Sequence, residues 1–231
     1  MRKKRITAEE LMAQLQRDPA YVKRQAELAD AHELREAEIA LAMRPLLQRL
    51  AEQGYEVSDL RELVLRHAPL APKVVDTLLE WLPKIEDGAI KEHIVRALGA
   101  AGAPFPGESL AELFDRSTSE GLRWAIANTI AEARPGGITD WVLERARDPA
   151  TGKAREMLAL AVARLAPPEV ANAALLRMLD DLPGHVALAL AEIGGPYEAT
   201  VLEAKSAATR GWVKREIEAA IRAIRRRSRG R

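Results

Sequence analysis

The sequence predicts an all-α protein built from successive helical hairpins, and three observations lead to this prediction. Apolar residues recur at i, i+3, i+4 and i+7, the spacing of one buried helical face. No segment shows the sustained alternation of apolar and polar residues that is typical of a half-buried strand. The same apolar template occurs five times, with starts 32, 32, 28 and 31 residues apart, a period that fits two helices and their connections.

The five copies of the template begin at Ile94, Ile126, Leu158, Val186 and Ile217. Shorter apolar helices are expected before four of them, near residues 74–82, 110–114, 138–146 and 170–178. Prolines and glycines mark the corners between helices, as expected for first helical turns and C-terminal caps. One hairpin cannot bury its apolar face alone, so the hairpins must share a core. The expected architecture is a right-handed α-α superhelix.

The N-terminal third has a different pattern. Thr7 and Glu10 match a capping box, and a long helix is expected from Pro19 toward Gly54. Some 35 helical residues would span about 52 Å. Residues 23–38 carry charges nearly all round the helix and have little to bury. Two interpretations remain open: an arm that docks on a partner or on a second copy, or a solvated helix folded back on the first repeats.

Two further features shape this part of the chain. We expect Pro45 to kink the long helix or to split it near Met43, because proline removes a backbone hydrogen bond and crowds the preceding turn. A short helix capped by Ser58 follows. The expected organisation is an N-terminal helical arm and cap over 1–68, about five hairpins over 69–226 and a basic tail over 227–231.

Three segments resemble a known family. The string from Lys91 to Gly102 resembles the second helix of a HEAT repeat, and Arg147-Asp148-Pro149 resembles the turn inside such a repeat. The opening segments 7–12 and 18–22 are similar to the start of uncharacterised bacterial HEAT-repeat proteins. The resemblance covers roughly residues 70–226 and implies a HEAT-like solenoid whose second helices line a concave side. Gly99 is replaced by alanine in the next three copies, and the fourth copy is short.

Composition favours a water-soluble protein. Among 231 residues 48% are apolar and 30% are charged, and no stretch approaches the roughly 20 apolar residues of a membrane span. Cysteine is absent, which excludes disulfides and thiolate chemistry and suits a reducing compartment. No apolar segment follows the basic residues 2–5, so a signal peptide is not expected. We expect a cytoplasmic protein.

Positive charge is concentrated at the two ends. The first five residues carry four basic side chains, and residues 222–231 carry six arginines, without an acid in either segment. Because the net charge is only +1, the body between them carries −9. Such termini attract phosphate backbones or acidic surfaces, although charge runs also occur as solvated ends.

Catalytic patterns are not found. The four histidines, His32, His67, His93 and His185, lack the spacing of a zinc site. No Gly-x-Ser-x-Gly elbow is present, and the glycines after residue 98 precede no P-loop lysine. We therefore expect no enzymatic activity, no metal and no cofactor.

The second helices carry the candidate partner-binding residues, on the side opposite the buried face: Glu92, Arg96, Trp124, Asn128, Glu156, Leu160, Leu188 and Arg215. Trp124, Leu160 and Leu188 would form an apolar ridge, bordered by Arg96 at one end and by Arg215 with Arg222 at the other. The alternative is that tight curvature buries the ridge between repeats. Three other tryptophans, Trp81, Trp141 and Trp212, are expected to pack between repeats.

Three functions are considered. The first is a non-enzymatic scaffold that binds a protein or peptide through its concave face. The second is nucleic-acid binding through the basic termini, as in HEAT-like DNA glycosylases. The third is a role resembling bilin lyases or chaperones. Asn128 follows Trp124 where a glycosylase would need an acid, and the body is negative, so the scaffold is preferred. Self-association stays open.

Overall fold

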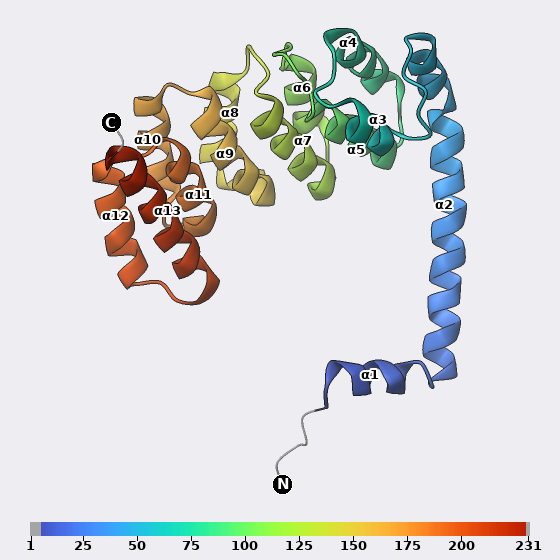
Figure 1. Ribbon diagram of the computed structural model, residues 1–231, viewed down its shortest axis with the longest axis horizontal. Helices are drawn as coiled ribbons and strands as arrows, with labels where there is room; N and C mark the ends of the chain where they lie inside the picture. Colours follow the sequence, from blue (N-terminus) through green and yellow to red (C-terminus); the bar gives the residue numbers. More distant parts are fainter. Residues whose placement is uncertain (1–5, 230–231) are drawn as a thin grey trace. The chain divides into compact units, whose positions relative to one another are not determined.

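The computed structural model describes residues 6–229, and the regular structure in that range is entirely helical (Figure 1). Two isolated bridges, from Leu70 to Ala101 and from Pro106 to Gly136, join connecting segments. The chain divides between Gln48 and Arg49 into two units, which are described separately. The all-α prediction is therefore confirmed for the described residues.

The first unit contains α1 (Ala8–Leu15) and most of α2 (Pro19–Glu52), whose last residues belong to the second unit. The predicted capping box forms: the Glu10 amide donates to Thr7 Oγ1 over 3.2 Å, and the Thr7 amide donates to Glu10 Oε2 over 2.9 Å. These bonds satisfy two amides that a helix start leaves open. Helix α1 has no buried residue, and every side chain of α2 from Val22 to Glu38 is exposed.

The prediction for Pro45 is wrong insofar as it allows a split, because α2 runs unbroken through this residue. Pro45 is exposed, whereas Met43, Leu46 and Leu50 are each at most 4% exposed. The unpaired carbonyl created by a proline can bond to water on an exposed face, and burial on the opposite face stabilises the helix on both sides of it.

The second unit contains two short 3-10 helices, η1 (Leu82–Lys84) and η2 (Pro149–Ala154), and the remaining α-helices: α3 (Leu60–His67), α4 (Pro72–Trp81), α5 (Gly88–Leu98), α6 (Glu108–Arg116), α7 (Glu120–Ala133), α8 (Thr139–Arg147), α9 (Arg155–Leu165), α10 (Pro168–Met178), α11 (Pro183–Ile193), α12 (Pro196–Ala207) and α13 (Gly211–Arg229). Each expected repeat helix is present. Helix α12 was not singled out from the sequence. It starts at Pro196, and its buried residues include the polar Glu198 and Ser206, which weakens its apolar periodicity.

The cap of α3 lies one residue later than predicted. Asp59, not Ser58, accepts a hydrogen bond from the Glu62 amide over 2.7 Å. Ser58 instead donates to Glu62 Oε2 from its amide over 2.6 Å and from its hydroxyl over 2.8 Å. These bonds, together with the Arg66 guanidinium, lower the pKa of Glu62 to about 2. Ser58 and Asp59 are both good caps, so composition alone does not separate them.

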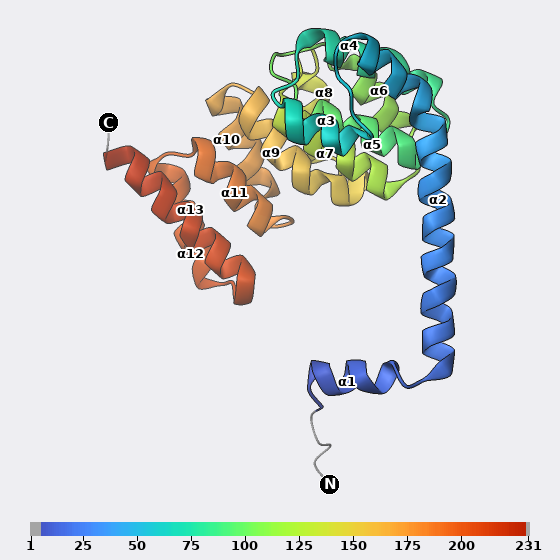
Figure 2. The ribbon, with the colours of Figure 1, turned by 45° about the vertical axis from the view of Figure 1, so that its right-hand side comes forward.

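The helices of the second unit pair along the sequence: α4 with α5, α6 with α7, α8 with α9, α10 with α11 and α12 with α13. The second helix of each pair also packs on the second helix of the next, so α5, α7, α9, α11 and α13 form a continuous series that starts from α3 (Figures 1 and 2). The first residue of each template copy, from Ile94 to Ile217, is fully buried. The shared core that the repeat predicts is therefore present.

Candidate partner-binding surface

The eight predicted binding residues lie on five helices that pack in sequence. We call this set the repeat face: Glu92 and Arg96 on α5, Trp124 and Asn128 on α7, Glu156 and Leu160 on α9, Leu188 on α11 and Arg215 on α13. Arg96, Leu188 and Arg215 are exposed, and the other five are partly exposed. None of the eight side chains is fully buried.

The structure brings three of these residues together where α5 meets α7. Arg96 donates to Glu92 Oε1 from Nε over 2.9 Å and from Nη2 over 2.6 Å. The Arg96 guanidinium carbon also lies 6.0 Å from the centre of the Trp124 ring. This distance is the outer limit of a cation–π contact.

Helices α9 and α11 meet through a second pair. Glu156 Oε2 lies 3.7 Å from Nε2 of His185, a contact that is ionic when the histidine is protonated. Leu160 is partly exposed one turn after Glu156, and Leu188 is 39% exposed on α11. The apolar part of the repeat face therefore continues from α9 to α11.

The centre of the face is open to hydrogen bonding. The Asn128 side-chain amide makes no hydrogen bond within the described residues. An amide side chain offers two donors and one acceptor oxygen, the complement of a peptide bond. Among the described residues, no hydrogen bond or ion pair joins the α7 members of the face to its α9 members.

The prediction for Trp212 is wrong, because this side chain is 56% exposed rather than packed between repeats. It lies in the first turn of α13, ahead of the buried face that begins at Ile217. The edge of its ring covers Gly184, where an added Cβ would lie 3.0 Å from ring carbons. Trp81 and Trp141 are partly buried. A small residue at 184 is the only sequence signal for this contact, and it comes from a different repeat.

An apolar cavity lies beside the first end of the face and was not predicted. It has a volume of about 510 Å³ between α3 and α5, and its lining includes Val64, Leu65, His93 and Arg96. Leu65 is 85% exposed at its edge. The cavity extends the repeat face beyond Arg96 with apolar surface.

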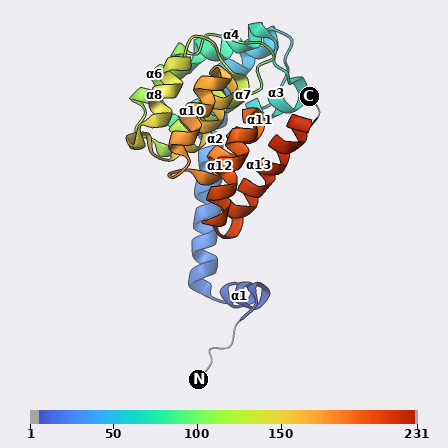
Figure 3. The ribbon, with the colours of Figure 1, turned by 90° about the vertical axis from the view of Figure 1, so that its left-hand side faces the viewer.

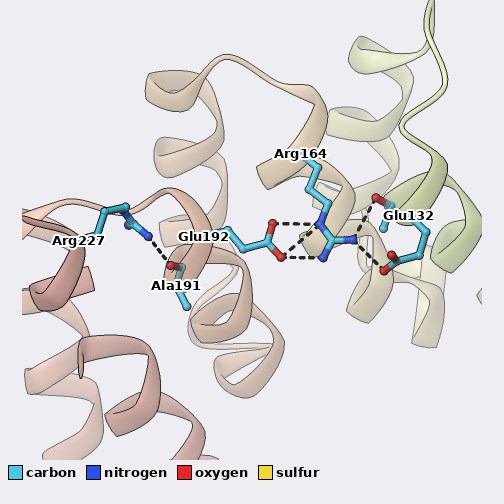
Figure 4. A network of polar contacts seen from close by, with 6 residues as sticks. Glu132, Arg164, Ala191, Glu192 and Arg227 are labelled. Carbon is cyan, nitrogen blue, oxygen red and sulfur yellow. Dashed lines mark hydrogen bonds and ion pairs between the residues drawn. The ribbon is translucent and has the colours of Figure 1, made fainter. Parts of the chain in front are cut away.

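A network of arginines fixes the helices that carry the face (Figure 4). Arg164 on α9 donates to Glu192 over 2.7 to 3.2 Å, to Glu132 Oε1 over 2.8 Å and to the Ala131 carbonyl over 3.1 Å. The hydrogen bonds to Glu192 and then to Glu132 outweigh the effect of burial and raise the pKa of Arg164 above its usual value. Arg227 on α13 donates to the Ala191 carbonyl over 2.6 Å. The C-terminal ends of α7, α9, α11 and α13 are thus tied together.

Hydrogen bonds also join α6 and α8, the first helices of two successive pairs. Asp115 on α6 accepts from Arg145 on α8 over 2.8 and 3.1 Å, and from Trp141 Nε1 over 3.0 Å. Burial raises the pKa of Asp115, but the hydrogen bonds from Arg145 and Trp141 outweigh it and hold that pKa below its usual value. Trp141 also packs edge-on against Phe114 with ring centres 5.2 Å apart.

Other features of the described residues are few. No group of three or more His, Cys, Asp or Glu side chains is placed to hold a metal ion within residues 6–229. In the same range, no helix combines the length and the apolar character that crossing a bilayer requires. The chain matches no family model, no curated protein and no solved structure.

Proposed function

We propose that the protein is a non-enzymatic scaffold that binds a peptide segment of a partner protein along the repeat face. The observation that carries the proposal is that Trp124, Leu160 and Leu188 lie on the second helices of three successive pairs, on the side away from the core, and keep at least part of their surface accessible to solvent. Trp124 lies two residues before the start of its template copy, and Leu160 and Leu188 lie two residues after theirs. A folded chain gains no stability from apolar side chains left in water, whereas a binding surface uses them.

The proposal includes a HEAT-like, right-handed superhelix whose concave side is the repeat face. Two features support it: the order in which the second helices pack, and a period near 32 residues. Repeats of this kind contact only their neighbours and present an extended inner surface to a partner.

The chemistry of the face matches an extended peptide. Trp124 supplies a broad apolar anchor, and the Glu92–Arg96 pair supplies a charged rim beside it. The Asn128 amide can bond to a peptide group, while Leu160 and Leu188 accept apolar side chains farther along. Tryptophan is enriched among residues that dominate binding energy, and truncating such a residue costs about 2 kcal/mol or more.

A selection with displayed peptides tests the proposal. A random peptide library is panned on the wild-type protein, and the enriched peptides are then measured by calorimetry against wild type and Trp124→Ala. We expect affinity to fall about thirtyfold in Trp124→Ala, which corresponds to 2 kcal/mol. Leu188→Lys, at a more exposed position, provides a second variant that does not depend on the packing of Trp124.

Tyr197→Ala is the matched control, because Tyr197 is 69% exposed on α12, outside the repeat face. It should leave peptide affinity unchanged. Circular dichroism and thermal unfolding confirm that each variant is folded. Peptides that bind Trp124→Ala and Leu188→Lys as tightly as wild type would refute this site.

A further inference from the structure

Helix α13 carries four arginines that the fold does not use. Arg215, Arg222, Arg226 and Arg229, named here the arginine stripe, are all exposed, and none makes a hydrogen bond or ion pair within residues 6–229. The other two arginines near the end of the helix have structural partners. Arg225 pairs with Glu203, and Arg227 donates to the carbonyls of Ala191 and Gly194. The helix therefore separates structural arginines from free ones.

The free arginines share one side of the helix. At 100° per residue they fall within an arc of about 60°, opposite the buried residues Ile217, Ala220, Ile221 and Ile224. They extend over about 21 Å of helix axis. Helix α13 closes the series at the end of the second unit, and Figure 3 shows it with no other helix in front.

Within the described residues no acidic side chain pairs with this stripe, and Glu218, the acid beside it on the helix, lies nearest to Lys214. The helix has two acids, Glu216 and Glu218, and both are partly buried. Glu218 lies 3.9 Å from Lys214 and Glu203 of α12 pairs with Arg225, while Glu192 of α11 pairs with Arg164. A terminal repeat needs a polar outer face to stay soluble, but this need does not select a single sign of charge.

An aromatic platform lies at one end of the stripe. Trp212 is 56% exposed one turn before Arg215, and Gly184 of α11 supports the edge of its ring. Clustered arginines with an exposed aromatic ring are the combination that single-stranded nucleic acids use, because phosphates bind guanidinium groups and bases stack on rings.

We propose that α13 binds single-stranded nucleic acid, with the arginine stripe on successive phosphates and Trp212 stacked on a base. An acidic protein segment is the less suitable occupant. Protein interfaces concentrate apolar anchors and exclude charge from their centre, whereas the residues between Arg215 and Arg222 on this side of the helix are the charged Glu218 and the small Ala219. Nucleic-acid interfaces are much more positive. A single strand is favoured over a duplex because an indole ring at this position stacks only on an unpaired base.

Fluorescence anisotropy with the full chain and a labelled 15-nucleotide oligothymidine tests the proposal. Four phosphate contacts predict that the logarithm of affinity falls with the logarithm of salt concentration with a slope of about −3. Arg222→Glu with Arg226→Glu should weaken binding about tenfold or more and bring the slope to about −1.5. Trp212→Ala should weaken it about tenfold.

The matched control is Arg147→Glu with Arg177→Glu, which makes the same charge change at exposed positions on α8 and α10. This control should retain most of the affinity. The proposal is overturned if wild type fails to bind at low salt, or if both double variants lose affinity equally. It is also overturned if a duplex of the same length binds as tightly as the single strand and Trp212→Ala does not weaken its binding. A third contrary result is that polyglutamate of equal charge displaces the labelled oligonucleotide as effectively as unlabelled oligothymidine does. Arg215 belongs to both the stripe and the repeat face, but the substituted residues Trp212, Arg222 and Arg226 lie outside the repeat face.

Discussion

Replacing Arg164 by methionine tests how much the arginine network contributes to stability. The Arg164 side chain is 17% exposed and bridges three helices, through Glu132 and the Ala131 carbonyl on α7 and through Glu192 on α11. Methionine keeps an apolar stem of similar length, so the change removes chiefly the guanidinium and its hydrogen bonds.

The expected loss is about 2 kcal/mol in the free energy of unfolding. The carboxylates of Glu132 and Glu192 are 52% and 36% exposed and regain water, so their ion pairs contribute little beyond about 1 kcal/mol. The Ala131 carbonyl is buried at the end of α7 and is left without this donor, which adds about 1 kcal/mol. For a chain of this size such a loss lowers the melting temperature by roughly 6 °C.

Urea unfolding followed by circular dichroism measures the change, and Arg49→Met provides the comparison. Arg49 pairs with Glu52 on the surface of α2, where both side chains are more than half exposed. Its loss should cost less than about 0.5 kcal/mol. The network does not hold the helices together if the free energy of unfolding of Arg164→Met lies within about 0.5 kcal/mol of the wild-type value. The same conclusion follows if that free energy is no lower than the value for Arg49→Met.

Three further changes are expected to have measurable effects. The pKa of Asp115 is lower in the folded state than in the unfolded state, so the pairing of Asp115 with Arg145 stabilises the fold fully above the unfolded pKa near 4. This stabilisation is lost as the pH falls through the lower folded pKa. Asp115→Asn should therefore cost at most about 1 kcal/mol in the free energy of unfolding at pH 7, and unfolding curves in acid should show no difference between the variant and wild type. Arg134 caps α7 at a φ of 53°, a conformation that favours glycine, so Arg134→Gly should stabilise the fold by up to about 1 kcal/mol and raise the melting temperature. An unchanged melting temperature would indicate that contacts of the Arg134 side chain offset the backbone strain. Pro45→Ala restores a hydrogen bond inside α2 and should stabilise the chain by about 1 to 3 kcal/mol, and a loss of stability in urea would contradict the account of α2.

The helical fold could be predicted because its signal is local. The residues that start each copy, such as Ile126 and Leu158, reach the core through a periodicity that can be read along a single helix. The same reasoning placed Trp124 and Leu188 on the side away from the core, where the structure leaves them accessible. Helix α12 was overlooked because buried Glu198 interrupts its apolar pattern.

Contacts between repeats could not be predicted in the same way. The exposure of Trp212 depends on Gly184, and the position of Arg96 over Trp124 depends on how α5 and α7 are offset. The apolar cavity forms only where α3 packs beside α5. Such features depend on the register between helices, which hydrophobic periodicity leaves undetermined.

The charges of the Arg164 network also specify the order of the hairpins. Glu132, Arg164 and Glu192 each lie six residues after the start of a template copy, so the sign alternates from one hairpin to the next. Deleting the α8–α9 hairpin, or packing α7 directly on α11, would set Glu132 against Glu192 and leave both without Arg164. Hairpins that share the same apolar spacing are thereby distinguished by charge, and an arrangement that brings Glu132 and Glu192 together is penalised while the chain folds.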